Sequence, residues 1–199
     1  MATWLVVGLG NPGPAYAGHR HNIGAMAAAE LARRGRGVRK SQRLLKADTA
    51  DIKVGEAGAG AVGGDLDRVV LARTRTYMNE SGVPVRALLG HLKLRPDHLI
   101  VIHDELDLDF DRLKVKYGGG DNGHNGLKSI RAMARTGEYY RVRAGIGRPA
   151  GPIDVSDWVL SNFNRSEVSS LPGLVGRAAD ATESLIRQGL DATQQRYNS

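Results

Sequence analysis

The sequence predicts a single α/β domain with three layers, in which helices cover both faces of a twisted, mixed but mostly parallel sheet. Short apolar segments that fit buried strands alternate with longer segments that have helical apolar spacing, and no clear linker separates them. Several of the short segments resemble hairpins, which favours a mixed sheet. At 199 residues the chain has the usual size of one domain. We assign residues 1–190 to this domain and expect a loose tail over 191–199.

The first half of the chain begins with a strand and a helix on either side of a glycine- and proline-rich loop. Residues 4–8 are apolar and end at a glycine, which is typical of a buried strand. Asn22 is suited to cap the next helix, and Gly35 is suited to end it after Arg34. The remaining segments predict an edge or meander strand over 46–54, a loop over 55–67, a strand over 68–73 and a helix from Pro84 to about residue 92.

The second half repeats this alternation. Residues 98–103 are strongly apolar and strand-like, and an acidic segment follows them. Residues 112–117 alternate apolar and basic side chains, as a half-exposed strand does. The other predicted elements are a glycine-rich loop over 118–126, a helix over 127–135, a strand over 140–146, a loop over 147–157 and a last helix between Pro172 and Gly189.

Charge and composition limit the class of protein. The net charge is +7, and residues 33–46 carry seven Lys and Arg with no acid, which fits an anionic partner such as nucleic acid or simply a solvated surface. The absence of cysteine excludes disulfides and a thiol nucleophile, and it fits a reducing compartment. The N-terminus has no basic signal region, and the apolar run 4–9 is too short to span a bilayer. We therefore expect a soluble, cytoplasmic protein.

Two motifs that suggest a cofactor or a metal fail on inspection. Gly8-x-Gly10-x-x-Gly13 matches the dinucleotide fingerprint in form, but Pro12 and Pro14 remove backbone donors around the third glycine. The acidic residue that should end the second strand is also missing. The run Asp-x-Asp-x-Asp over 107–111 lacks the glycine and glutamate that a calcium loop requires. No histidine or cysteine spacing supports a metal, so we predict neither metal nor cofactor.

Without an activated serine or a cysteine, an enzyme built on this chain must attack through water, for which a neutral imidazole is the usual base. His21 follows the N-terminal loop at a predicted helix start, where the helix dipole favours the neutral ring. Asp104 lies beyond a strand end and is the natural partner to orient that ring. The glycine-rich run either binds an anion or carbonyl oxygen through its free amides or is an ordinary loop.

Basic side chains flank that run on two predicted strands. Lys114 and Lys116 project from one face of the first strand, and Arg141 and Arg143 do the same on the second. Two such pairs around a glycine-rich loop are consistent with a phosphate clamp. Edge-strand charges can equally serve only to block aggregation.

Six ordered motifs together resemble the bacterial-type peptidyl-tRNA hydrolases. They are Val7–Gly13, Tyr16, Arg20-His21-Asn22, Tyr77–Gly82, His103–Asp107 and Gly118–Leu127, and the resemblance covers nearly the whole chain. It implies a monomeric, metal-independent enzyme that cleaves the ester between a peptide and the 3′ end of tRNA. It also implies His21 as base and Asp104 as its orienting partner. The substrate residues implied are Asn11, Tyr16, Met78, Asn79 and Asn125, and the clamp for the tRNA 5′ phosphate is implied to be Lys114, Lys116 and Arg143.

Three positions depart from the family pattern. His19 stands where a small polar residue is usual, and Asp109 stands where proline is common. Asn122 replaces a glycine in the glycine-rich loop, although asparagine tolerates the left-handed backbone better than most residues. Two other classes of function stay open on sequence alone. One is a non-catalytic tRNA- or RNA-binding module, and the other is a dinucleotide-dependent enzyme.

Overall fold

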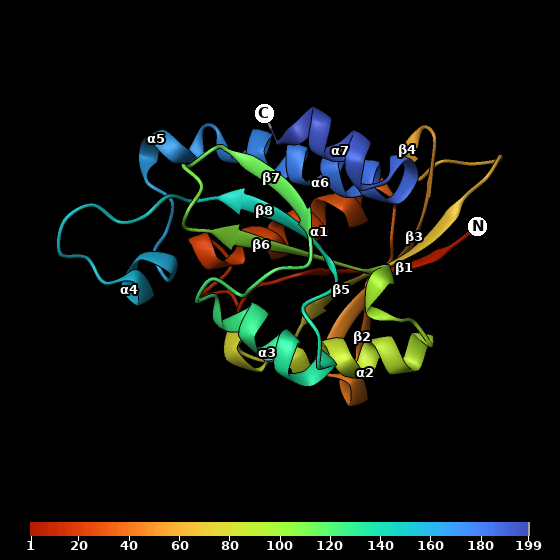
Figure 1. Cartoon of the computed structure of the whole chain (residues 1–199), viewed down its shortest axis with the longest axis horizontal. Helices are drawn as coiled ribbons and strands as arrows, with labels where there is room; N and C mark the ends of the chain where they lie inside the picture. The colour runs from red at the N-terminus through yellow and green to blue at the C-terminus, as the bar shows by residue number, and fades with distance from the viewer. Residues whose placement is uncertain (199) are drawn as a thin grey trace.

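The computed structural model describes residues 1–198, which form three layers around one sheet (Figure 1). In this part of the chain the sheet has eight strands in the order β2-β3-β5-β1-β6-β8-β7, with β4 paired to β3. The four central strands β5, β1, β6 and β8 are parallel, and antiparallel strands flank them on both sides. The strands are β1 (Thr3–Gly8), β2 (Lys40–Gln42), β3 (Ala47–Gly55), β4 (Gly58–Ala59), β5 (Asp67–Thr74), β6 (Leu99–Glu105), β7 (Leu113–Tyr117) and β8 (Tyr140–Gly145). The predicted fold class is therefore confirmed.

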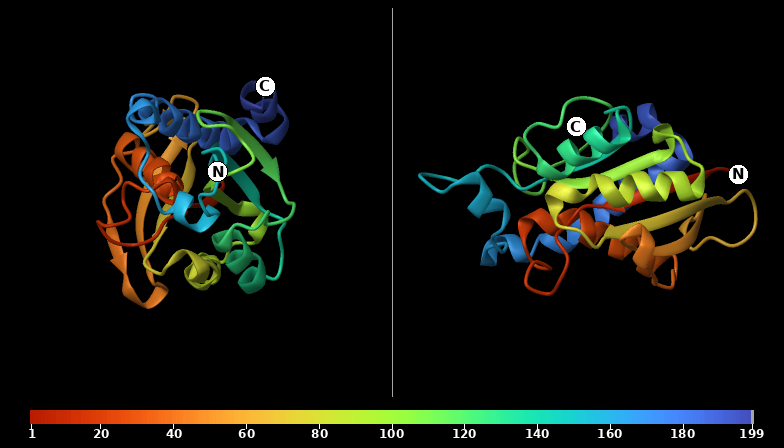
Figure 2. Two further views of the ribbon diagram at one scale, coloured as in Figure 1. Left: turned by 90° about the vertical axis from the view of Figure 1, so that its left-hand side faces the viewer. Right: turned by 90° about the horizontal axis from the view of Figure 1, so that it is seen from below.

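Helices cover both faces of the sheet, as the two views in Figure 2 show. On one face α1 and α6 pack over a core that includes Val6, Ile100 and Leu185. On the other face α2 and α3 pack over Leu5, Val101 and Ile130. The helices are α1 (Ile23–Arg34), α2 (Gly82–Leu92), α3 (Asn125–Ala134), α4 (Val155–Val159), α5 (Arg165–Val168), α6 (Leu171–Gln188) and α7 (Leu190–Tyr197), with 3₁₀ turns η1 (Arg20–Asn22), η2 (Arg43–Leu45), η3 (Met78–Glu80) and η4 (Pro96–His98). Within residues 1–198, none of these helices combines the length and the apolar character needed to cross a membrane.

Close backbone packing seats α1 against the end of the sheet. A side chain at Gly8 would collide with the carbonyl oxygen of Gly24, and a side chain at Gly24 would collide with that of Ile102. Leu9 fixes the same approach, because its N–H donates to Ile102 O at 3.0 Å and its carbonyl accepts from Ala25 N at 3.0 Å. The turn η1, which precedes α1, is thereby held beside the carboxyl ends of β1 and β6.

The C-terminal segment differs from the sequence prediction. The prediction of a loose tail is wrong over residues 191–198, because Leu190–Tyr197 forms α7 and packs beside β7. Thr193 is buried, and the Asn198 side chain accepts from Val115 N at 2.7 Å and donates to Val115 O at 2.9 Å. Gln194 Nε2 donates to the same carbonyl at 3.1 Å. A polar segment that looks unstructured in sequence is thus ordered by backbone groups of a strand far away in the chain. Residue 199 lies outside the described residues.

Candidate active site

The carboxyl ends of β1 and β6 bring the predicted catalytic side chains together. Asn11 follows β1, and Asp104 is the sixth residue of β6. His21 lies in η1, which the packing of α1 holds over the same ends. Asn125 begins α3, which approaches from the opposite face of the sheet. This is the edge at which open α/β sheets place their ligands, since loops from neighbouring parallel strands converge there.

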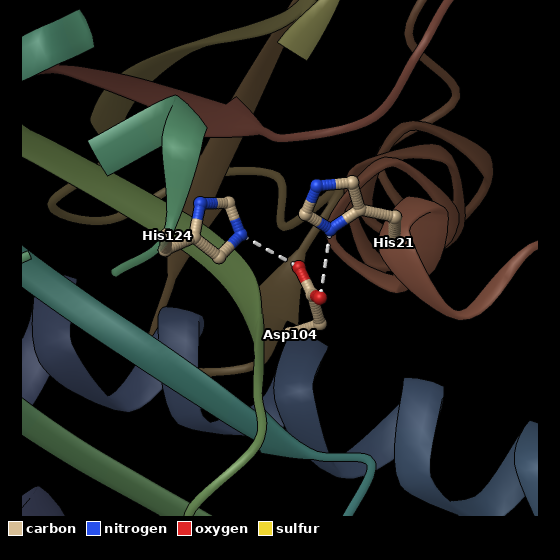
Figure 3. Close-up of side chains that lie close together, drawn as sticks. All are labelled: His21, Asp104 and His124. Carbon is tan, nitrogen blue, oxygen red and sulfur yellow. Dashed lines mark hydrogen bonds and ion pairs between the residues drawn. The ribbon is translucent and has the colours of Figure 1, made fainter. Parts of the chain in front are cut away.

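His21 and Asp104 form a buried hydrogen-bonded pair (Figure 3). His21 Nδ1 lies 2.8 Å from Asp104 Oδ2, and the two side chains are only 7% and 3% exposed. A carboxylate accepts, so Nδ1–H must be the donor. The lone pair of the neutral ring is then on Nε2, on the side of the ring that faces away from Asp104. A proton acceptor in this orientation is what general-base activation of water requires.

A second imidazole binds the other oxygen of Asp104. His124 Nε2 lies 2.7 Å from Asp104 Oδ1. His124 also caps α3, because its Nδ1 accepts from the backbone N–H groups of Gly126 and Leu127 at 3.1 and 3.4 Å. Nδ1 is therefore unprotonated, and Nε2–H donates to the carboxylate. Sequence reasoning missed this residue, although the run Gly123-His124-Asn125-Gly126 was the signal available.

The environment of Asp104 keeps it ionised. Burial alone would raise the pKa of Asp104, but electrostatic attraction to His21 and His124 and the hydrogen bonds from both outweigh burial and hold the pKa well below its usual range. His103 lies behind this group and donates from Nδ1 to the Asp104 carbonyl oxygen at 2.7 Å. Burial first, and then the electrostatic interaction with His124, lowers the pKa of His103 to about 3, so this ring is neutral at physiological pH. Asp104 is thus the one fixed negative charge among three imidazoles.

Asn11 is fixed by three hydrogen bonds from different segments. Its N–H donates to Asn22 Oδ1 at 3.0 Å, and its carbonyl accepts from Asn22 Nδ2 at 2.9 Å. Its own Oδ1 accepts from Met78 N at 2.7 Å. Asn11 Nδ2 makes no hydrogen bond within residues 1–198, so it is left as a donor. The prediction that Asn22 caps α1 is corrected, because its side chain makes no capping hydrogen bond. Both its Oδ1 and its Nδ2 bond instead to the backbone of Asn11.

The other predicted substrate residues surround this centre. Met78 is buried in η3, and a side chain at Gly126 would strike its sulfur, so α3 approaches η3 closely. Asn79 follows Met78, and both Asn79 and Asn125 are exposed. The rings of Tyr16 and Tyr77 meet edge to face with centroids 6.0 Å apart. The loop after β1, η3 and α3 therefore line one continuous rim.

The predicted phosphate clamp divides into exposed and buried members. Lys114 lies opposite Arg143 in the β7–β8 ladder, and Lys116 lies opposite Arg141. Burial, and then the charges of Arg143 and Arg141, lowers the pKa of Lys116. Arg141 is almost fully buried and donates to the carbonyls of Gly119, Gly120 and Gly137. The sequence left open whether Arg141 shares in a phosphate clamp, and in the structure it anchors the glycine-rich loop instead.

Asn122 gives the glycine-rich loop a specific set of contacts. Its backbone is left-handed, with φ of 50°. Its Nδ2 donates to Glu105 Oε1 at 3.0 Å and to Asp107 Oδ2 at 2.5 Å. Glu105 Oε2 accepts in turn from Arg143 Nε at 3.2 Å. The residue that departs from the family pattern therefore ties the loop to the strand that bears Asp104 and, through Glu105, to the clamp.

Replacing Asn122 by glycine removes these bonds while keeping a backbone that fits φ of 50°. We expect the free energy of unfolding to fall by about 1–2 kcal/mol, because two hydrogen bonds to charged groups are lost. Urea unfolding measures this change. Asn122→Ala is the matched control, since it loses the same bonds and adds left-handed strain of ~1–2 kcal/mol. Wild-type stability in Asn122→Gly would mean that the side-chain bonds contribute nothing.

A cavity of about 130 Å³ opens beside the buried pair, between the glycine-rich loop and α4. Val155 and Val159 of α4 line it together with His21, Asp104 and His124. Sequence analysis predicted only a loop here, and α4 occupies its end.

Arg20, the neighbour of His21, binds the segment around α4. Its guanidinium lies 3.6 Å over the Trp158 ring and donates to Ser161 Oγ and Glu167 Oε2, both at 2.6 Å. Arg20 thus holds the wall of the cavity, and the next residue, His21, is the proposed base.

Ligand atoms of His21, Asp104 and His124 all lie within 4.8 Å of one another, which is close enough to hold a metal ion. The hydrogen bonds argue for a different use of these groups. Each histidine turns an N–H toward Asp104, and His124 uses its second nitrogen to cap α3. A metal bound between them would have to displace both of these protons.

The open α/β sheet and a buried histidine–carboxylate pair at its carboxyl edge define a class of enzyme that uses a histidine base. Comparisons with known proteins narrow this class. Residues 5–199 match the family model for peptidyl-tRNA hydrolase, and the chain belongs to that family. It is 52% identical over 197 residues to a peptidyl-tRNA hydrolase of Cutibacterium acnes, covering 99% of this chain and 98% of the relative. It is 49% identical to one of Streptomyces avermitilis, covering 100% and 95%. A crystal structure of peptidyl-tRNA hydrolase from Acinetobacter baumannii superposes with a TM-score of 0.85 at 30% identity, covering 99% and 95%.

Proposed function

We propose that this protein hydrolyses the ester bond between a peptide, or an N-blocked amino acid, and the 3′ end of tRNA, which returns tRNA for reuse. The observation that carries the proposal is the buried His21–Asp104 pair beside the fixed Asn11 amide, in a chain of the peptidyl-tRNA hydrolase family. Because tRNA serves translation in the cytoplasm, we place the activity there, and we propose that the protein acts as a monomer. A protein that only binds tRNA would need no buried base with a free lone pair.

In the proposed reaction His21 Nε2 removes a proton from water as the oxygen attacks the ester carbonyl carbon. Asp104 accepts from Nδ1–H, which keeps the lone pair on Nε2 and stabilises the imidazolium that forms. The tetrahedral intermediate then collapses, and the C–O bond to the tRNA 3′ oxygen breaks. The proton on Nε2 passes to that oxygen, so that the products are a tRNA with its 3′ hydroxyl and a free carboxylic acid, which then releases its proton to water and becomes a carboxylate. Neither a metal nor a cofactor takes part in this scheme.

Neutral amide donors are assigned to the developing oxyanion and to the peptide. Asn11 offers Nδ2 because its Oδ1 already accepts from Met78 N. Asn79 and Asn125, exposed on the facing rim, are assigned to the peptide backbone, whose N–H and C=O groups match both ends of an amide. Met78 forms part of the floor, and Tyr16 is assigned to the terminal nucleotide. Such donors act mainly in the transition state, where charge appears on the carbonyl oxygen.

The test of this function is release of an N-blocked amino acid from its tRNA, measured with EDTA present and without added nucleotide. Hydrolysis under these conditions, and its loss in a variant without the His21 imidazole, is the expected result. Activity that vanishes with EDTA would show that a metal is needed. Equal and slow release by wild type and variant would favour the RNA-binding alternative.

Lys114, Lys116 and Arg143 are assigned to the 5′ phosphate of the tRNA. Changing Lys116 and Arg143 together to glutamate should raise KM at least tenfold and leave kcat within a few-fold, since two phosphate contacts become repulsive. Steady-state kinetics at low salt, with tRNA substrates that carry or lack the 5′ phosphate, measures the effect. For the substrate that lacks the 5′ phosphate, the double variant should raise KM much less. An unchanged tRNA affinity in the double variant would rule out the clamp.

A further inference from the structure

A group of three arginines surrounds a buried carboxylate at the sheet edge on the far side of the active site from the clamp. Asp48, at the start of β3, is only 6% exposed. Its Oδ2 lies 3.0 Å from Arg39 Nη2 and 3.9 Å from Arg73 Nη2, and its Oδ1 lies 3.8 Å from Arg75 Nη1. We call Arg39, Arg73 and Arg75 the arginine cluster.

One carboxylate does not neutralise this cluster. Only Arg39 lies within hydrogen-bond distance of Asp48. Arg75 Nη1 donates to Ser41 Oγ, and the other N–H groups of Arg73 and Arg75 are left for another acceptor. The side chains of Arg39, Arg73 and Arg75 are 70%, 46% and 44% exposed. An ion-pair network whose only purpose was to neutralise Asp48 would not need three exposed guanidinium groups.

Further cations extend the cluster along β2 and η2. Lys40, Arg43 and Lys46 are exposed, and none of them pairs with an acidic side chain within residues 1–198. The first part of the same basic run behaves differently, because Arg33 and Arg34 pair with Glu30. The uncompensated positive charge of the run is therefore concentrated beside the cluster.

The register places this charge at the same edge as the proposed base. Asp48 pairs with Arg73 in the β3–β5 ladder, and Arg73 pairs with Gly8, after which β1 leads to Asn11. The left view of Figure 2 looks onto this edge, with the orange strands β2 and β3 on one side and the green β7 on the other. Arg143 on β8 is three strand spacings away from Arg73 on β5, roughly 14 Å. The clamp and the cluster are therefore far enough apart to contact different phosphates.

The surface between the cluster and the site suits unpaired nucleotides. Arg39, Asp48 and Arg73 line a groove of about 240 Å³ whose other wall is formed by alanines of α1. Arg75 precedes the exposed Tyr77 by two residues, and Tyr77 pairs with Tyr16. A positively charged groove together with exposed aromatic rings is the usual means of holding single-stranded nucleic acid.

We propose that the arginine cluster, with Lys40 and Arg43, is a second tRNA-binding site that contacts backbone phosphates of the 3′-terminal strand of the acceptor end. This inference rests on the proposed function for the identity of the RNA. The two basic groups then hold the tRNA from opposite sides of the ester. The attraction depends on phosphate charge and not on base sequence, which suits a protein that serves many tRNAs.

Two paired variants test the site. Arg39→Gln/Arg73→Gln removes two members of the cluster, and Lys40→Gln/Arg43→Gln removes charge without touching Asp48. Each should raise KM for N-blocked aminoacyl-tRNA about tenfold with kcat unchanged, and each should make the slope of log(kcat/KM) against log[salt] shallower by about 1–2. Hydrolysis of an N-blocked aminoacyl ester of adenosine, which has no phosphate, should stay at the wild-type rate. Lys53→Gln, on the opposite end of β3, is the control.

Binding of fluorescent deacylated tRNA, measured by anisotropy, separates this inference from the proposed reaction. The two paired variants should bind about tenfold more weakly than Lys53→Gln does. If the wild-type protein hydrolysed neither ester, while the paired variants bound tRNA more weakly than the wild type, the proposed function would be refuted and this site supported. Unchanged KM, salt slope and tRNA affinity in both variants would overturn the site. An equal loss on the adenosine ester would also overturn it, since that result indicates local damage.

Discussion

Replacing His21 by alanine should lower kcat for N-blocked aminoacyl-tRNA by ~10²–10⁴-fold, with little change in KM, because the variant lacks the base that accepts the proton of water. The structure makes this expectation specific. No other imidazole of the group offers an accessible free nitrogen, since His124 uses both of its nitrogens and the unpartnered Nε2 of His103 is buried. Single-turnover hydrolysis measures the loss directly.

Two further variants complete this test. His21→Asn provides an amide that can still donate to buried Asp104 but cannot act as a base, so it should lose activity while unfolding near the wild-type temperature. His91→Ala, at an exposed histidine at the end of α2, should keep full activity. If His21→Asn retained wild-type kcat, general-base catalysis by this residue would be excluded.

Asp104→Asn should lower kcat by ~10⁴-fold, comparable to the loss when a triad aspartate is changed to asparagine and its histidine adopts the wrong tautomer. His124 Nδ1 accepts from two backbone N–H groups, so its Nε2–H must find an acceptor. The carbonyl of the introduced amide would turn toward His124, and the NH₂ group of that amide would then face His21 Nδ1. That contact requires an unprotonated Nδ1, which moves the proton of the His21 ring to Nε2 and removes the base.

Nitrogen NMR of the imidazoles distinguishes this account from a simple loss of charge. The His21 signals should report protonation at Nδ1 in the wild type and at Nε2 in Asp104→Asn. The double variant His21→Ala/Asp104→Asn should be about as slow as His21→Ala alone, because the two residues act as one unit. Fully additive losses, or an unchanged tautomer in the single variant, would contradict the proposed role of Asp104.

Local sequence patterns were sufficient for the fold class and for the central strands and the large helices, but not for the short elements β2, β4, α4 and α5 or for α7. They also identified the family, because glycines, His21 and Asp104 occur in ordered motifs. What they could not supply was contact between segments far apart in the chain. That His21 and Asp104 lie 2.8 Å apart depends on how closely α1 approaches β6 at Gly24. His124 was missed because helix caps are expected to be Ser, Thr, Asp or Asn, and a capping histidine has no comparable signal.

The differences between prediction and structure have the same origin. Alternation in strand β8 assigns Arg141 and Arg143 to one face, but only the folded glycine-rich loop shows that its carbonyls cover Arg141. Capping propensity suggests that Asn22 serves α1, yet the backbone of Asn11 offers its amide two bonds instead of one. In both cases a long-range partner overrides a local preference that is correct on average.

The contacts of Asn198 with Val115 bear on how the protein behaves at high concentration. β7 is the outermost strand on its side of the sheet, and an uncovered outer strand offers its N–H and C=O groups to strands of other molecules. Asn198 and Gln194 occupy these groups at the middle of β7, and the lysines on either side of Val115 add charge repulsion. On the opposite side β2 is only three residues long and begins at Lys40. Both margins of the sheet therefore resist intermolecular strand addition, so the open sheet is protected from growing into aggregates.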